Sequence, residues 1–238
     1  MARSNSYSRH WFEFFHAGIG TERTEREADF VCHFAPWPAF RKVLDLCCGM
    51  GRHARALAQR GYSVAGVERD GAAIAKARES GGGPEYIQAD VREYKPADSE
   101  FDLAIVMSQS FGYFDAATNR EMLARLARGV RIGGRIVLDV WNPEFFAARL
   151  GERMLEVPAG NVHERKAIRD GRLFVHLTYP DATEENFEWE LFTPAEMESL
   201  AGSVGLSLEK TCPDFNPNTT PDASDVRLQF ILERGSES

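Results

Sequence analysis

Three features are scarce in this sequence of 238 residues: long apolar runs, cysteine motifs and clustered positive charge. No stretch approaches the ~18 apolar residues of a membrane-spanning helix, and the first 18 residues lack the apolar run of a secretion signal. The four cysteines include an adjacent pair but no C-x-x-C spacing, which argues against a zinc site or a disulfide framework. We therefore expect a cytoplasmic protein with no bound metal and no membrane partner.

The charge balance is negative. Lys and Arg total 28 against 36 Asp and Glu, which gives a formal net charge of −8 at pH 7. Proteins that bind nucleic acid use an excess of positive charge to neutralise phosphates. The balance therefore favours a small-molecule substrate over nucleic acid, and no pattern specifies an oligomeric state.

The middle of the chain alternates between two kinds of apolar segment. From residue 43 to residue 141, short β-rich runs such as VLDL and SVAGVE are separated by helical stretches such as HARALAQR. This alternation predicts an α/β fold with a doubly wound, mostly parallel sheet and crossover helices. Glycines at 61, 81–83 and 133–134 are expected to end helices. Before this region, apolar spacing predicts helices over 9–16 and 21–35, which form an N-terminal helical cap.

The pattern changes after Trp141. Residues 153–193 contain the alternating runs LFVHLTY and FEWELF, with a turn expected at Asp170 and Gly171, and they predict a small antiparallel β insertion. A helix is expected to begin at Thr193 and Pro194. The last two apolar runs, LSLEKTC and DVRLQFILER, are expected to close the main sheet as a terminal antiparallel hairpin.

A glycine-rich turn follows the first predicted strand, in the segment VLDLCCGMGRHA at 43–54. Only small residues permit so tight a turn between a strand and a helix, and the backbone N–H groups and helix dipole then face a ligand above the strand end. The same letters also occur in tight turns that bind nothing, so the neighbouring strands must decide.

Acidic residues end the next two predicted strands. Glu68, in VAGVERD, lies 17 residues beyond Gly51, where a carboxylate can accept hydrogen bonds from both hydroxyls of a ribose. Asp90, in YIQADV, can accept from an exocyclic adenine amine. Taken singly, the first can be a solvated charge and the second a helix or turn cap. Together with the glycine turn they predict one ligand site, because open α/β sheets bind ligands at the carboxyl ends of their strands.

These segments resemble the class I S-adenosylmethionine-dependent methyltransferases. The similar segments are VLDLCCGMG, VAGVERD, YIQADV, FDLAIVMSQSFGYF and RIGGRIVLDVWNPE, and the resemblance covers residues 41–143, continuing more faintly to 233. It implies a seven-stranded sheet and methyl transfer from S-adenosylmethionine to a nitrogen or oxygen of a small molecule by in-line displacement. From this resemblance and the patterns above, we expect an N-terminal helical cap (1–40), a cofactor-binding core (41–143), an antiparallel β cover over the acceptor site (144–193) and a completing segment (194–238).

The resemblance implies which residues lie at the cofactor. Asp45 and Arg52 are expected to hold its methionine end, Gly49 and Gly51 to let the backbone approach it, and Glu68 to bind the ribose. The full expected set is Asp45, Cys47, Gly49, Gly51, Arg52, Glu68, Arg69, Asp90, Val91 and Ser108.

The later members of this set follow the second, third and fourth strands. Asp90 and Val91 are expected to frame the adenine, and Ser108 is expected to lie near the sulfonium. Arg69 can pair with the adjacent Glu68 and weaken ribose binding.

Two other functions compete with methyl transfer. A nicotinamide-dinucleotide oxidoreductase is one, because GMGRHA also fits the dinucleotide fingerprint. Asp45 argues against it, since a carboxylate repels a pyrophosphate but attracts the cationic amino group and sulfonium of S-adenosylmethionine. A non-catalytic cofactor-binding protein of the same fold is the other.

The loop at 108–114 is expected to lie above the methyl group. The candidate catalytic residues are Gln109, Ser110 and Tyr113, which can orient an acceptor or accept a proton, while Phe111 and Phe114 can bound the pocket; alternatively, these side chains only pack the loop. The loop lacks the N/D-P-P-Y/F sequence that, by family resemblance, marks enzymes acting on nucleobases or protein amides. This again favours a small-molecule acceptor.

Further candidates lie in the two flanking regions. In the insertion, the expected specificity residues are His163, His176, Tyr179 and Trp189, although alternation along strands turns half of such residues outward. Near the N-terminus, the aromatic residues that can close over the cofactor, or simply form the underside of a helix, are Trp11, Phe12, Phe14 and Phe15. The histidines considered as bases are His16, His53 and His176, with a structural or cofactor-contacting role favoured for His53.

Overall fold

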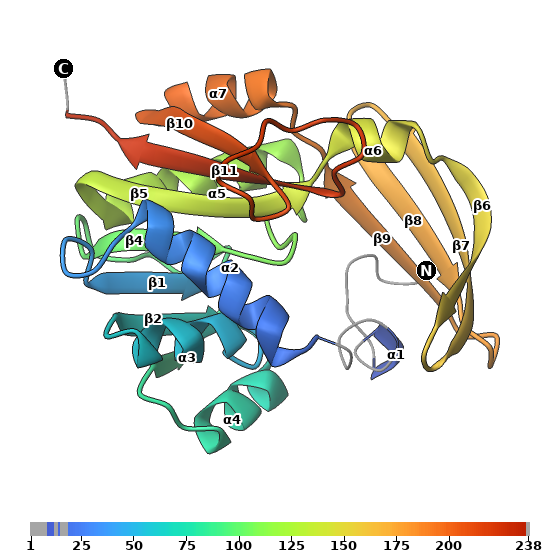
Figure 1. Ribbon diagram of the computed structural model, residues 1–238, viewed down its shortest axis with the longest axis horizontal. Coiled ribbons are helices and arrows are strands. Elements are labelled where there is room, and N and C mark those ends of the chain that lie inside the picture. Colours follow the sequence, from blue (N-terminus) through green and yellow to red (C-terminus); the bar gives the residue numbers. More distant parts are fainter. Residues whose placement is uncertain (1–8, 12–13, 15–18, 237–238) are drawn as a thin grey trace.

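The computed structural model describes residues 9–11, 14 and 19–236, and it contains two sheets (Figure 1). The larger sheet has seven strands in the order β10-β11-β5-β4-β1-β2-β3, and the smaller has four in the order β6-β7-β8-β9. The strands of the larger sheet are β1 (Lys42–Leu46), β2 (Ser63–Glu68), β3 (Glu85–Gln88), β4 (Phe101–Val106), β5 (Val130–Trp141), β10 (Leu206–Pro213) and β11 (Arg227–Arg234). The strands of the smaller sheet are β6 (Gly151–Val157), β7 (Gly160–Arg169), β8 (Arg172–Thr178) and β9 (Glu184–Glu190).

The larger sheet confirms the predicted topology. Strands β1 to β5 pair in parallel, while β11 pairs antiparallel with both β5 and β10 and so forms the terminal hairpin. The central strands β1 and β4 are buried along almost their whole length, which explains their continuous apolar runs. Because the chain turns outward in opposite directions from β1, toward β2 on one side and β4 on the other, the crevice expected of such sheets opens at the carboxyl end of β1.

Helices cover both faces of the larger sheet (Figure 1). The helices are α1 (Arg9–Trp11), α2 (Thr21–Phe34), α3 (Arg52–Gln59), α4 (Gly71–Glu79), α5 (Ala116–Gly129), α6 (Pro143–Ala147) and α7 (Pro194–Gly202). On one face, Val31 of α2, Leu57 of α3 and Ile74 of α4 belong to one apolar cluster. On the other, Leu123 of α5 and Met197 of α7 belong to a second. The fold is therefore the predicted doubly wound α/β arrangement, with helices on both faces of the sheet.

The smaller sheet is an antiparallel meander formed by the insertion. Its central turn lies at Asp170 and Gly171, as predicted, with φ of 49° and 70°, the left-handed values that a tight two-residue hairpin requires. Figure 1 shows this sheet beyond the carboxyl ends of β1, β2 and β4. It is attached there to the loop after β4, because the Glu190 N–H donates to the Gly112 carbonyl at 2.8 Å. Gly112 is required at this contact, since a Cβ would lie 2.6 Å from the Glu190 oxygen.

Two predicted helix boundaries hold and one glycine prediction is wrong. Helix α2 occupies nearly the predicted range, and Thr193 begins α7 with a complete capping box. Gly133 and Gly134, however, lie inside β5 and end no helix, because α5 already stops at Gly129. Gly134 is needed because a Cβ there would lie 2.9 Å from the Asp102 oxygen of the neighbouring strand.

The N-terminal cap is confirmed in part. Helix α2 packs on the larger sheet as expected, whereas of the predicted helix over 9–16 the described residues form only the short α1. Phe12, Phe15 and His16 lie outside the described residues. In the part of the chain that the structure describes, no helix is long and apolar enough to cross a membrane.

Candidate active site

A cavity of about 1200 Å³ opens at the carboxyl ends of β1, β2 and β4. Most of the predicted cofactor residues contribute to its wall, namely Cys47, Gly49, Arg52, Glu68, Arg69, Val91 and Ser108. The wall continues to Ser110, Tyr113 and Phe114, and on the other side it includes Thr21 and Thr24 at the start of α2. One cavity thus joins the glycine turn to the loop predicted to meet an acceptor.

The glycine turn presents its backbone to this cavity. Gly49 has φ of 53°, and a Cβ built on it would have no atom within 4 Å, so a side chain there would project into open space. Gly51 has a different role from the one expected. It does not line the cavity, and a Cβ on it would lie 2.2 Å from the Tyr86 hydroxyl, so packing against Tyr86 requires this glycine.

Asp45 lies beneath the turn, is 1% exposed and does not line the cavity, so its contact with a cofactor stays a prediction. Its Oδ2 atom has no hydrogen-bond partner among the described residues. Burial raises the pKa of its carboxyl to about 7, against the opposing charge of Arg52 and the backbone N–H of Ala54. A buried carboxylate oxygen without a donor fits a ligand that brings a cationic amino group, and it does not fit a pyrophosphate.

Glu68 lines the cavity with a fixed carboxylate. One oxygen accepts from the backbone N–H of Gly49 at 3.2 Å and the other from that of Asp70 at 3.0 Å. Each carboxylate oxygen retains capacity for a second donor, so ribose hydroxyls can still bind. The backbone contacts orient the side chain before any ligand arrives.

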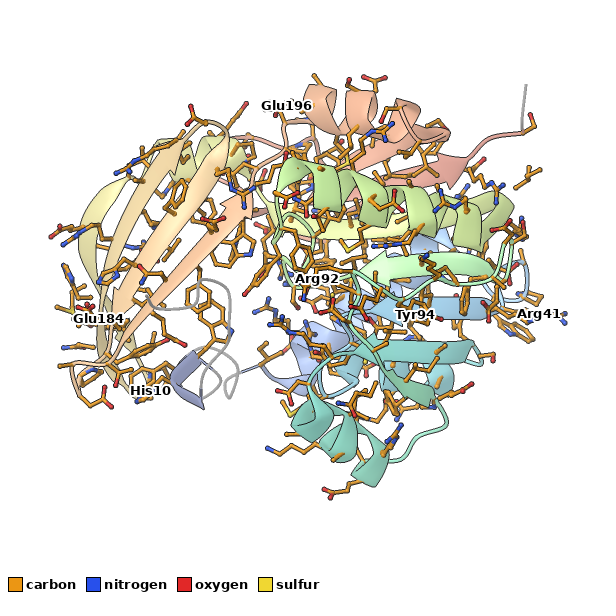
Figure 2. The ribbon with its side chains drawn as sticks, turned by 180° about the vertical axis from the view of Figure 1, so that it is seen from behind. His10, Arg41, Arg92, Tyr94, Glu184 and Glu196 are labelled. Carbon is orange, nitrogen blue, oxygen red and sulfur yellow. The ribbon has the colours of Figure 1, made fainter. Side chains whose placement is uncertain are left out.

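Asp90 is engaged by a residue that the sequence reasoning did not consider. Its carboxylate forms a bidentate pair with Arg92, at 2.6 and 3.0 Å, and also accepts from the Arg92 backbone N–H. The hydrogen bonds from Arg92 lower the pKa of Asp90 to about 2. Arg92, labelled in Figure 2, also lies over the Phe114 ring at 5.5 Å. Val91 lines the cavity and Asp90 does not, so a contact from Asp90 to adenine stays a prediction.

Arg52 is held by a buried carboxylate from α2. Its guanidinium lies 2.5 Å from Glu27, which is fully buried, and donates to the Ser108 hydroxyl at 3.0 Å. Burial acts to raise the pKa of Glu27, but the hydrogen bond from His53 and the charges of Arg52 and Arg227 hold it far below its ordinary value. Sequence reasoning missed Glu27 because it lies on the predicted cap, far from every motif.

His53 contacts Glu27 at 2.8 Å and is 5% exposed. Burial lowers the pKa of its ring to about 4, so the ring is neutral at physiological pH. With one ring nitrogen committed to Glu27, His53 anchors α3 to α2. His53 also lines the cavity, so both the structural and the cofactor-contacting role favoured from the sequence stay open.

The three candidate catalytic residues lie on the loop after β4, and only two of them face the cavity. Ser110 and Tyr113 line the cavity, but Gln109 does not. With its amide oxygen facing Arg227, Gln109 accepts from the guanidinium at 2.5 and 3.0 Å. Its side chain is therefore turned away from an acceptor, and the expectation that it acts on one is not supported. Phe111 is 1% exposed and packs on Phe192, so it is core and not pocket wall.

The four predicted specificity residues of the smaller sheet lie on two different faces, because side chains alternate along a strand. Trp189 and Tyr179 lie on the inner face, each 2% exposed, and Trp189 packs edge-on against Tyr113 with ring centroids 5.7 Å apart. His163 and His176 lie on the opposite face, since the alternate residues of their strands are the buried ones. His176 pairs there with Asn186 at 2.9 Å. The two histidines are therefore not brought to the cavity.

The described N-terminal aromatics pack on the smaller sheet and not over the cavity. Trp11 lies 4.6 Å from Phe187 and Phe14 lies 5.1 Å from Tyr179, measured between ring centroids. His10 contacts Asp181 at 2.9 Å, at the same end of this sheet as Glu184 (Figure 2). Of the two alternatives given for Trp11 and Phe14, these contacts favour a packing role, here against the inner face of the smaller sheet, over a cover for the cofactor.

Comparisons with known proteins agree with this geometry. The family model described as "Methyltransferase domain" matches residues 43–134. The chain is 25% identical over 215 residues to the putative methyltransferase YqeM of Bacillus subtilis, covering 84% of this chain and 87% of that one. It is 32% identical over 154 residues to the ubiquinone biosynthesis O-methyltransferase of Pseudomonas aeruginosa, covering 57% of this chain and 61% of that enzyme.

The fold has solved counterparts as well. The S-adenosylmethionine-bound structure of CalS10, an amino pentose methyltransferase from Micromonospora echinaspora, superimposes with a TM-score of 0.71 at 20% identity. The match covers 98% of this chain and 99% of that one, so it includes the smaller sheet. The family match itself covers the strands and turns that build the cavity, and together these comparisons support a class I S-adenosylmethionine-dependent methyltransferase.

Proposed function

We propose that this enzyme methylates a nitrogen or oxygen of a small-molecule acceptor by in-line displacement. The observation that carries the proposal is the single cavity of about 1200 Å³ that runs from the glycine turn to Ser110 and Tyr113. This volume exceeds the roughly 300 to 1000 Å³ of common small-molecule pockets and leaves room for an acceptor beside a cofactor.

The cofactor is expected to lie along the glycine turn. Asp45 and Arg52 would hold the amino group and carboxylate of its methionine end, Glu68 would bind the ribose hydroxyls, and Val91 would contact the adenine. When bound, S-adenosylmethionine supplies an electrophilic methyl group. The protein then has only to exclude water and align the nucleophile.

Ser110 and Tyr113 are the side chains placed to orient that nucleophile. Tyr113 is held against Trp189 of β9, so the insertion positions a group in the cavity wall. We therefore propose that residues 144–193 form a cover over the acceptor site, between the core at 41–143 and the completing segment at 194–238. A proton leaving the acceptor would pass to a hydroxyl or to water, because the neutral His53 is committed to Glu27.

Several observations favour a small metabolite as the acceptor. The relatives include one named for ubiquinone biosynthesis and O-methylation and a structural neighbour named for an amino pentose, which together cover oxygen and amino-sugar acceptors. The formal net charge of −8 disfavours nucleic acid. The four cysteines are all free, in keeping with the reducing cytoplasm expected from the sequence.

A labelled-methyl assay tests the proposal. The protein is incubated with S-adenosylmethionine carrying a labelled methyl group and a panel of amines, amino sugars, phenols and carboxylates, with Asp45→Asn as the cofactor-binding control. We expect label in an N- or O-methylated small molecule for the native protein and none for the variant. Label recovered only in added RNA or protein would contradict the proposal.

A further inference from the structure

Two consecutive residues of the cavity loop have left-handed backbone. Ser108 and Gln109 have φ of 56° and 57°, a region that side chains with a Cβ rarely adopt. Such conformations persist only where the surrounding structure holds them in place. Because Ser108 lines the cavity, whatever holds this turn also fixes part of the cofactor site.

Asp139 of β5 contacts both residues of the turn. Its side-chain Oδ2 accepts from the Ser108 N–H at 2.8 Å, and its backbone carbonyl accepts from the Gln109 N–H at 3.0 Å. Its other carboxylate oxygen accepts from Gln229 at 2.8 Å. Asp139 itself is fully buried, so its carboxylate has only protein donors to stabilise it.

Arg227 connects this carboxylate to the helix on the other side of the cavity. Its guanidinium donates to Asp139 and, at 3.2 Å, to Glu27 of α2. Glu27 in turn lies 2.5 Å from Arg52. Arg52 completes this ring of contacts by donating to the Ser108 hydroxyl at 3.0 Å.

These contacts form a ring of two carboxylates, two guanidiniums and one serine. Rings of buried charge seldom stabilise a fold more than apolar residues of the same volume do, so stability alone is a poor reason for this one. The ring encloses the left-handed turn and includes Arg52, which lines the cavity. The geometry of the ring therefore suits a role in positioning the Ser108–Gln109 turn and Arg52 at the cavity.

We propose that Asp139 is a positioning residue for the cofactor site, which it serves by holding the Ser108–Gln109 turn in its left-handed conformation. Arg227 and Glu27 transmit the same constraint to Arg52. The proposal rests on the proposed function only in that the cavity binds S-adenosylmethionine, and it requires no particular acceptor.

Asp139→Asn is the primary test. The substitution removes the negative charge and leaves one acceptor oxygen. The new amide N–H₂ faces either the Gln229 donor or the donors of Ser108 and Arg227, so the support of the turn is weakened in both orientations. Hydrogen exchange is measured by mass spectrometry on peptides covering 107–111, and S-adenosylmethionine affinity by calorimetry. We expect roughly 10-fold faster exchange at the turn amides and roughly 10-fold weaker cofactor binding, the range that one lost buried hydrogen bond supports.

Asp102→Asn is the matched control. Asp102 also accepts from two backbone N–H groups, those of Arg41 and Lys42 at 2.8 and 2.9 Å, and from Arg131 at 2.7 Å. It lies at the amino end of β4, away from the cavity. Its variant should speed exchange near residues 41–42 and leave both the 107–111 peptides and cofactor affinity unchanged.

A double-mutant cycle separates positioning from general loosening. In a Ser108→Gly background one of the two left-handed residues no longer needs holding, so Asp139→Asn should weaken cofactor binding by less than the roughly 10-fold expected in the native background. If Asp139→Asn does not fold, Arg227→Lys replaces it, because a lysine reaches only one of the two carboxylates and should give a smaller effect of the same sign.

Two results would overturn the proposal. One is an Asp139→Asn or Arg227→Lys variant whose turn amides exchange at the native rate. The other is an equal loss of cofactor affinity in both backgrounds of the cycle. Neither measurement uses an acceptor, so a failed acceptor screen would leave this inference standing, and its own failure would leave methyl transfer standing.

Discussion

The two sheets differ in how their buried charged groups are paired. In the larger sheet the buried charges lie at the carboxyl edge, around the cavity, and at least one of them, Asp45, has an oxygen with no partner in the described residues. In the smaller sheet, Glu164 and Lys166 lie on the inner face and neutralise one another at 2.8 Å. Glu185, on the same face, accepts from Tyr179. The larger sheet thus leaves a buried carboxylate oxygen for a ligand to meet. In the smaller sheet the buried charges are paired or hydrogen-bonded, and the buried polar atom left without a partner among the described residues is the uncharged Trp189 Nε1–H, so we interpret this sheet as a support.

Trp189→Ala should have the largest effect, and it should fall on the supporting sheet. Trp189 is 2% exposed and packs on Tyr113, Trp141 and Phe187. Loss of a buried tryptophan lowers the free energy of unfolding by about 3 to 5 kcal/mol, as measured by urea denaturation. Cofactor affinity of the remaining folded protein should change less than threefold. A parallel loss of cofactor affinity would show that the two sheets do not act separately.

Asp45→Asn should have the opposite pattern of effects, with weaker cofactor binding and no loss of stability. Without the carboxylate, S-adenosylmethionine is expected to bind about 100-fold more weakly in calorimetry, in the range for a lost buried charge partner. The variant should also be more stable than the native protein by at least about 1 kcal/mol at pH 8, because one unit of pKa shift corresponds to about 1.4 kcal/mol and the amide carries no ionisation cost. A variant that is both destabilised and normal in cofactor binding would remove Asp45 from the site.

The pH dependence of cofactor binding provides a second test of whether the Asp45 carboxylate binds the cofactor. Since burial raises the pKa of Asp45 to about 7, most of the free protein carries the neutral acid at pH 6 and the carboxylate at pH 8. A cationic ligand selects the carboxylate, so affinity should fall about tenfold from pH 8 to pH 6, with proton release on binding near pH 6. The Asp45→Asn variant should show no such dependence. An equal slope in both proteins would assign the titration to another group.

The raised pKa of Asp45 also predicts how the stability of the cofactor-free protein changes with pH. The unfolded carboxyl has a pKa of about 3.9, so between about pH 4 and pH 7 the folded state holds this proton more tightly. The contribution of Asp45 to the free energy of unfolding therefore decreases as pH rises through that window. Comparison of native and Asp45→Asn unfolding curves across it measures the effect.

His163→Ala and His176→Ala should have the smallest effects. Both residues lie on the outer face of the smaller sheet, away from the cavity. We expect changes within about 0.5 kcal/mol in stability and within twofold in cofactor affinity and methyl transfer. A larger loss of methyl transfer in either variant would move the acceptor to the outer face and contradict the division between the sheets.

Prediction from sequence succeeded for turns and helix ends whose conformation depends only on a few neighbouring residues. The turn after β1 needs glycine whatever surrounds it, and Thr193 caps α7 with residues three positions apart. It failed where a partner distant in the sequence decides. Gly134 permits the close approach of β4, and Gln109 turns to a guanidinium more than a hundred residues away.

The sequence by itself determined the order of strands and helices, the glycine turn and the acidic ends of the strands, because periodicity and turn chemistry depend on neighbouring residues. Only the tertiary structure decided which faces those side chains present. It paired Asp90 with Arg92, buried Asp45 with one oxygen lacking a donor among the described residues, and joined Glu27, Asp139 and Arg227 around Ser108. The physical reason is that hydrogen bonds and charges in a dry interior are matched between residues far apart in the chain, a matching that exists only once the chain has folded.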